Sequence, residues 1–95
     1  MRGYILESKH FLNQAQALVE GQRHKDYGDK DDNHINIAKL WSAYKDVEIT
    51  AHDVAIMMAL LKIARTKLGS VSMDTYIDMS AYSSIAGEIK FKDDE

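Results

Sequence analysis

Two aspartates near the C-terminal end of the sequence, Asp74 and Asp78, are four residues apart in a segment with helical apolar spacing. In a helix this spacing places both carboxylates on one face, where like charges repel by about 0.2–0.5 kcal/mol. A cation is therefore expected to face them, either Lys62, Arg65 or a divalent ion such as Mg²⁺, which prefers oxygen ligands. The structural alternative is that Asp74 stabilises the helix dipole and Asp78 pairs with Arg65.

The basic side chains Lys62 and Arg65 belong to the preceding segment, residues 51–68, and lie about 60° apart on a helix. This separation gives the helix a basic edge near its C-terminal end, which suits phosphate groups. Asp53, at the start of the same segment, is a third candidate ligand for Mg²⁺ beside Asp74 and Asp78. Capping of the helix start is an equally direct reason for an acid at position 53.

A polar block from residue 22 to residue 32 has no apolar period and is predicted to be a loop. The block contains cations, an aromatic ring and a glycine that lets backbone amides approach a ligand. These groups suit the phosphate and base of a nucleotide. The alternative is a solvated loop with its tyrosine against the core edge. The candidate ligand-binding residues of this block and of the helix start after it are Arg23, Tyr27, Gly28, Asp29 and Asn33.

The four histidines give little support for a metal site. His10 and His34 have no partner at a metal-ligand spacing, so both are predicted to be surface or boundary residues. The order His34, His52, Asp53, Asp78 imitates the ligand order of HD phosphohydrolases, but that fold needs more helices than 95 residues supply. Nucleophile triads, the Walker pattern and the dinucleotide-binding glycine pattern are also absent from the sequence.

The apolar pattern predicts an all-α fold. Residues 54–61 are apolar on every side, which predicts a buried central helix rather than a surface helix with one apolar stripe. Thr50 and Asp53 form an acidic capping box before this helix, Gly69 is its expected stop, and Asp31 or Asp32 is expected to cap the helix before it. The prediction is one domain, residues 1–95, folded as a four-helix bundle around its third helix, with a frayed tail at 91–95 and helices at residues 5–20, 32–45, 51–68 and 73–90.

The composition limits the cellular compartment and the partners that we expect. A chain of 95 residues buries only about 60–65% of its unfolded surface, so a homo-oligomer, dimer or larger, is expected to complete the core. The net charge of −3 gives no broad basic surface for duplex nucleic acid. No apolar run approaches the roughly 20 residues that cross a membrane, and cysteine is absent, so a cytoplasmic protein is expected.

Several blocks together closely resemble a family of short phage and prophage proteins, and the resemblance covers nearly the whole chain. They have the form R-x-x-x-Y-G-D from Arg23, W-S-A-Y from Trp41 and D-V-A-x-M-M-x-L-L-K-x-A-R from Asp53, followed by Asp74, Tyr76, Asp78 and Tyr82. The resemblance implies a viral or prophage origin, with action in an infected host cell, and implies no assigned activity.

Looser similarities point to nucleotides. The chain is similar to MazG-like all-α nucleotide pyrophosphohydrolases, which hold Mg²⁺ with E-x-x-E on one helix and E-x-x-D on the next, whereas this sequence offers Asp53 and then Asp74 with Asp78. The layout of Lys62, Arg65, Asp78 and Tyr82 is similar to that of small phage nucleotide kinases. Phage sponge proteins, which are helical oligomers that sequester signalling nucleotides, are a further analogy.

These observations leave three functional hypotheses. The first is a Mg²⁺-dependent nucleoside triphosphate pyrophosphohydrolase or a degenerate relative, with Arg23, Lys62 and Arg65 on phosphates and Tyr27 or Tyr82 on the base or sugar. The second is a sponge that binds cyclic or other signalling nucleotides without cleaving them. The third is an inhibitor of a host protein, which binds through methionine and aromatic side chains.

Overall fold

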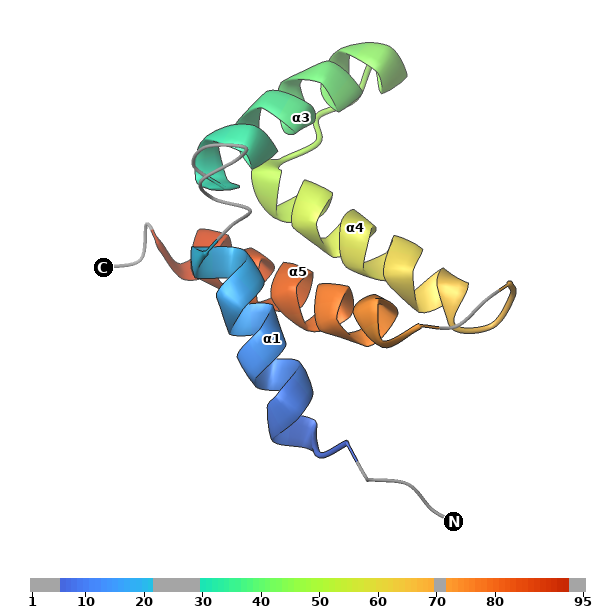
Figure 1. Cartoon of the computed structure of the whole chain (residues 1–95). Coiled ribbons are helices and arrows are strands. Elements are labelled where there is room, and N and C mark those ends of the chain that lie inside the picture. Colours follow the sequence, from blue (N-terminus) through green and yellow to red (C-terminus); the bar gives the residue numbers. More distant parts are fainter. Residues whose placement is uncertain (1–5, 22–29, 70–71, 93–95) are drawn as a thin grey trace.

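The computed structural model describes residues 6–21, 30–69 and 72–92, and every regular element in this part of the chain is a helix (Figure 1). The all-α prediction is therefore confirmed. The four helices are α1 (Ser8–Glu20), α3 (Lys30–Lys45), α4 (Ala51–Arg65) and α5 (Met73–Lys92). None of the described helices is long and apolar enough to cross a membrane.

The helix bounds differ from the expected ones at several ends. Helix α1 begins at Ser8 rather than at residue 5, and α5 continues to Lys92. Helix α3 begins at Lys30, so Asp31 and Asp32 lie within its first turn and the expectation that one of them caps it is wrong. In that turn the two acids still face the positive end of the helix dipole.

The start of α4 has the predicted capping box. The Thr50 hydroxyl accepts a hydrogen bond from the Asp53 amide at 3.0 Å, and the Asp53 carboxylate accepts one from the Thr50 amide at 3.0 Å. The helix ends at Arg65, earlier than expected, and just past this end the Thr66 hydroxyl donates to the Ile63 carbonyl at 2.7 Å. Gly69 then adopts a φ of 84°, which glycine reaches without strain.

A tight connection sets the position of α3 on α4. The Ser42 hydroxyl donates to the Ile49 carbonyl at 3.1 Å and accepts from the Ile49 amide at 2.8 Å. Asp46, between them, has a φ of 58°, a conformation that aspartate tolerates better than most residues. These bonds fix the end of α3 next to the start of α4.

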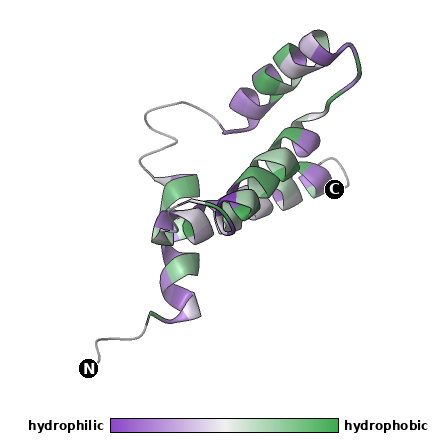
Figure 2. Ribbon diagram, turned by 90° about the vertical axis from the view of Figure 1, so that its right-hand side faces the viewer, coloured by the Kyte–Doolittle hydropathy of each residue, from purple (hydrophilic) through white to green (hydrophobic). Residues whose placement is uncertain are grey.

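Helices α1 and α4 pack against α5, and α3 packs against α4. Helices α4 and α5 lie side by side in both views, with apolar residues spread along them in Figure 2. One core cluster joins Ala15 of α1 to α5, and a second joins Ala55 of α4 to α5, with Val19 packed against both clusters. The α5 residues of these clusters are Ile77 and Ala81 in the first and Ile85 and Ala86 in the second.

The prediction that the third helix is buried on all sides is wrong for the single chain. Only Val54 and Ala55 of α4 are buried, whereas Leu60, near the middle of the helix, is 56% exposed. The reason is that α3 and α5 leave one side of α4 uncovered, so an all-round apolar sequence places many apolar side chains in solvent. Of the described helices, α5 has the most buried residues, namely Thr75, Ile77, Ala81, Ile85 and Ala86.

Candidate functional site on helix α5

An ion pair joins α4 to α5 at the center of the candidate site. The Lys62 Nζ lies 3.1 Å from the Asp78 Oδ2, and the two side chains are only 16% and 17% exposed. Of the two predicted cations, Lys62 is thus the one that faces Asp78. Because both groups are largely removed from water, removal of one would leave the other in a poorly solvated place.

The other two predicted charges of this region lie one helical turn away. Asp74 precedes Asp78 on α5 and Arg65 follows Lys62 on α4, and both are exposed. Within the described part of the chain neither makes an ion pair. The structure therefore brings Lys62 and Asp78 together and leaves Asp74 and Arg65 at the rim, where a ligand could approach them.

Asp53 lies at the opposite end of α4 from this ion pair. Nine residues separate it from Lys62, which corresponds to about 13.5 Å along the helix axis. Its carboxylate belongs to the capping box, and the hydrogen bond from the Thr50 backbone holds the pKa of Asp53 below its ordinary value of 3.8, with smaller help from the Thr50 hydroxyl and from His52 and Lys90.

The structure therefore does not bring the three predicted Mg²⁺ ligands together. Asp74 and Asp78 share a helix turn, and Asp53 is remote from both. Among residues 6–21, 30–69 and 72–92, no group of three or more histidine, cysteine or acidic side chains is placed to hold a metal ion. The described residues thus do not fit a carboxylate-held Mg²⁺ site.

Tyr82 continues the same face of α5, one turn after Asp78. Its ring lies against His34 of α3, with the two ring centroids 6.2 Å apart. His34 is buried, so its prediction as a surface or boundary residue is wrong. Helix α3 packs on α4, and the His34 ring also lies against Tyr82 of α5. The signal that could have found it is the spacing of His34, Ala38 and Ser42, a stripe that allows close approach of another helix.

The His34 ring is satisfied on one side only. Its Nδ1 lies 2.7 Å from the Lys30 carbonyl, to which it donates, so Nε2 of the neutral ring carries the lone pair. Within residues 6–21, 30–69 and 72–92, the buried Nε2 has no hydrogen-bond partner. A buried polar atom without a partner is unusual in a folded protein.

Ion pairs hold the start of α3 on the end of α5. Lys30 lies 3.3 Å from Glu88, and Lys92 pairs with Asp31, which is 61 residues away in the sequence. Sequence analysis missed these contacts because pairs so far apart leave no periodic signal. Asn33, a predicted ligand-binding residue, belongs to the same turn of α3. The predicted loop residues Arg23, Tyr27, Gly28 and Asp29 lie outside the described residues.

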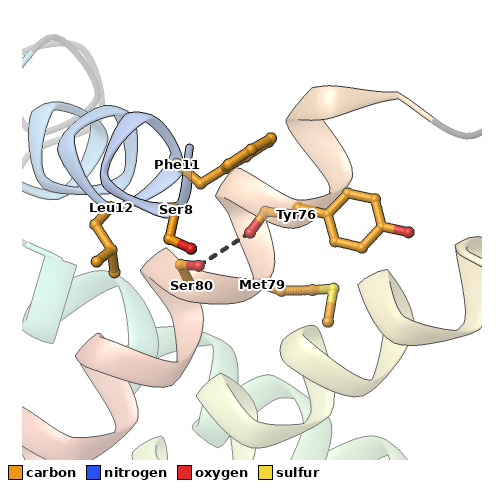
Figure 3. A pocket seen from close by; sticks show the side chains of 6 residues that line it. All are labelled: Ser8, Phe11, Leu12, Tyr76, Met79 and Ser80. Carbon is orange, nitrogen blue, oxygen red and sulfur yellow. Dashed lines mark hydrogen bonds between the residues drawn. The ribbon is translucent and has the colours of Figure 1, made fainter. Parts of the chain in front are cut away.

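A separate apolar pocket of about 500 Å³ lies between α1 and α5 (Figure 3). The Phe11 and Tyr76 rings meet edge to face there, with centroids 6.4 Å apart, and the Ser80 hydroxyl donates to the Tyr76 carbonyl at 3.1 Å. None of the predicted site residues lines this pocket. Its lining residues are Ser8, Phe11, Leu12, Tyr76, Met79 and Ser80.

Comparison with known proteins defines the class of this protein. Residues 10–90 match the family described as "Domain of unknown function (DUF6378)", and the chain belongs to this family. The resemblance to a phage family seen in the sequence is in agreement with the relatives described next.

Two phage proteins are similar to the chain. The Gene 55 protein of Mycobacterium phage L5 is 45% identical over 85 residues, which cover 88% of this chain and 54% of the phage protein. The Gene 55 protein of Mycobacterium phage D29 is 42% identical over 76 residues, 80% of this chain and 50% of that protein. The chain thus spans about half the length of these relatives, and no solved structure matches it.

Proposed function

We propose that the chain binds a phosphorylated nucleotide on the face of α5 that carries Asp78 and Tyr82. The observation that supports this proposal most is the largely buried ion pair between Lys62 and Asp78. A lysine ammonium has three donors, so Lys62 can hold Asp78 with one and a phosphate oxygen with another. Arg65, exposed one turn away, would add a second cation for the phosphates.

The position of the ion pair is a reason to consider function. Replacing a buried ion pair by apolar residues is often neutral or stabilising, so stability alone is a weak reason for a charged pair between two apolar helices. The Tyr82 ring, one turn further along α5, would contact the base or sugar of the nucleotide.

Binding without cleavage is the version that the geometry supports best. A MazG-like hydrolase would need acids that converge on Mg²⁺, and the described residues offer only Asp74 and Asp78 on one turn. The sponge hypothesis requires the cations and the aromatic ring but no catalytic ion. The two versions differ in one readout, since a hydrolase releases pyrophosphate from a nucleoside triphosphate and a sponge does not.

A thermal-shift screen over linear and cyclic nucleotides, with and without Mg²⁺, tests the proposal. A ligand at 100 times its dissociation constant adds about 2.7 kcal/mol, which raises the melting temperature of a domain of this size by roughly 10–20 °C. Lys62→Ala is expected to abolish the shift. The control Lys39→Ala removes an exposed lysine of α3 and is expected to keep the shift. No shift with any nucleotide, with or without Mg²⁺, would reject nucleotide binding.

A second candidate function is inhibition of a host protein, and the pocket between α1 and α5 favours it. The pocket is apolar and its rims carry Leu12 and Tyr76, both exposed, which suits an aromatic or aliphatic anchor of a partner. In a pull-down from host lysate, Leu12→Glu should lose a protein that the native chain retains, whereas Lys62→Ala should keep it. Equal recovery by the native chain and by Leu12→Glu would exclude the pocket as the binding surface.

A further inference from the structure

The side of α4 that faces away from α5 is apolar along the length of the helix. Ile56, Leu60 and Ile63 follow one another at intervals of four and three, which places them on one side, and Met57 and Leu61 flank them. All five side chains are between 39% and 56% exposed. Contiguous exposed apolar side chains on a helix mark an interaction surface.

We infer that a second copy of this chain covers this surface, with the two α4 helices antiparallel about a two-fold axis at Leu60. The inference is independent of the nucleotide proposal, because the Lys62 side chain extends from α4 to Asp78 of α5, away from this surface. A two-fold interface uses the same surface on both copies, and a surface that is apolar throughout its middle is complementary to itself.

The charges at the two ends of α4 favour the antiparallel orientation. Asp53 lies in the first turn of α4 and Lys67 lies just beyond its last residue, so an acid marks one end of the helix and a base the other. With Leu60 on the axis, Ile56 lies opposite the partner's Ala64, and the acidic end of one copy approaches the basic end of the other. A parallel pair would instead place like charges opposite each other, which is unfavourable. Among the described residues, no ion pair within the chain involves Lys67.

The core within one copy is small, which favours a second copy of the chain as the occupant of this surface. Among the described residues, the buried apolar side chains other than alanine are Val54, Ile77 and Ile85.

Cross-linking through a single cysteine tests the proposed axis directly. The native sequence contains no cysteine, so Leu60→Cys introduces the sole thiol of each copy. On the proposed axis the two thiols are neighbours, and a short bismaleimide should convert most of the protein to a covalent dimer. Leu40→Cys is the matched control, because Leu40 is 63% exposed on α3 and should remain uncross-linked. Equal cross-linking of both variants, or none of Leu60→Cys, would overturn the proposed interface.

Light scattering after size exclusion gives a second, independent readout. The native chain is expected to elute as a dimer, Leu60→Glu as a helical monomer, and the control Leu40→Glu as a dimer. Circular dichroism establishes that Leu60→Glu keeps its helices, and if it unfolds, Lys67→Glu just beyond α4 should raise the dissociation constant about tenfold without affecting the core. A native monomer, or a Lys67→Glu dimer as tight as the native one, would contradict the inference.

Discussion

The two ends of α4 carry aspartate contacts of different kinds. At the start of the helix, Asp53 and Thr50, three residues apart, share two hydrogen bonds. In each, the side chain of one residue accepts from the backbone amide of the other. Toward the other end, Lys62 reaches Asp78 on α5, so this contact joins two helices rather than neighbours within one. The first contact forms wherever this helix starts, whereas the second requires the tertiary fold.

This difference indicates which charged residues need a functional explanation. A carboxylate that caps a helix is accounted for by local structure. The largest cause of the lowered pKa of Asp53 is the hydrogen bond from the Thr50 backbone. A charge taken out of water between two helices has an energetic penalty that local structure does not explain. Both aspartates looked alike as Mg²⁺ ligands in the sequence, and only Asp78 keeps a case for ligand binding.

The largest effect is expected from breaking the tertiary pair. Lys62→Ala leaves the Asp78 carboxylate largely buried without its cation, and the free energy of unfolding should fall by about 2–3 kcal/mol. Urea denaturation measures this change. The control Asp74→Asn alters an exposed acid one turn away and should change stability by less than about 0.5 kcal/mol. A loss as small as that of the control would show that the ion pair is not maintained in solution.

Loss of the capping contact at the start of α4 should lower the free energy of unfolding less than loss of the ion pair. Thr50→Ala removes the hydroxyl that accepts from the Asp53 amide, and loss of such a cap lowers the free energy of unfolding by about 1 kcal/mol. Thr50→Ser keeps the hydroxyl and is the matched control. If Thr50→Ala proved more damaging than Lys62→Ala, the ranking of local and tertiary contacts would be reversed.

The smallest expected effect is a pH dependence of stability that arises from Asp53. Because the pKa of Asp53 is lower in the folded than in the unfolded chain, its stabilising contribution is present above about pH 4 and is lost as the pH falls through the folded pKa. Asp53→Asn lacks this titration, so the stability difference between it and the native chain should be greatest near neutral pH and shrink in acid. A difference that stays constant from neutral to acidic pH would contradict the role of the ionised cap.

The sequence predicted the helices and the α4 cap well because these depend on neighbours in the chain. Thr50 and Asp53 are three residues apart, and apolar periodicity marks a helix wherever it lies. The contacts that assemble the candidate site were not predictable in the same way. His34 is buried by α5, and Asp31 meets Lys92 across 61 residues. The prediction of a buried third helix was wrong. An apolar composition indicates that a helix surface tends to be covered, but it does not indicate whether the same chain covers it.

Isothermal titration of a nucleotide selected by the thermal-shift screen into the double variant Lys62→Met/Asp78→Leu tests the central claim most directly. This variant replaces the ion pair by apolar side chains of similar size, so its fold and stability should be close to native. If Lys62 and Asp78 form a ligand site, the double variant should melt near the native temperature and lose at least tenfold in affinity. Native affinity in a variant with both charges removed would show that the ion pair plays no part in binding.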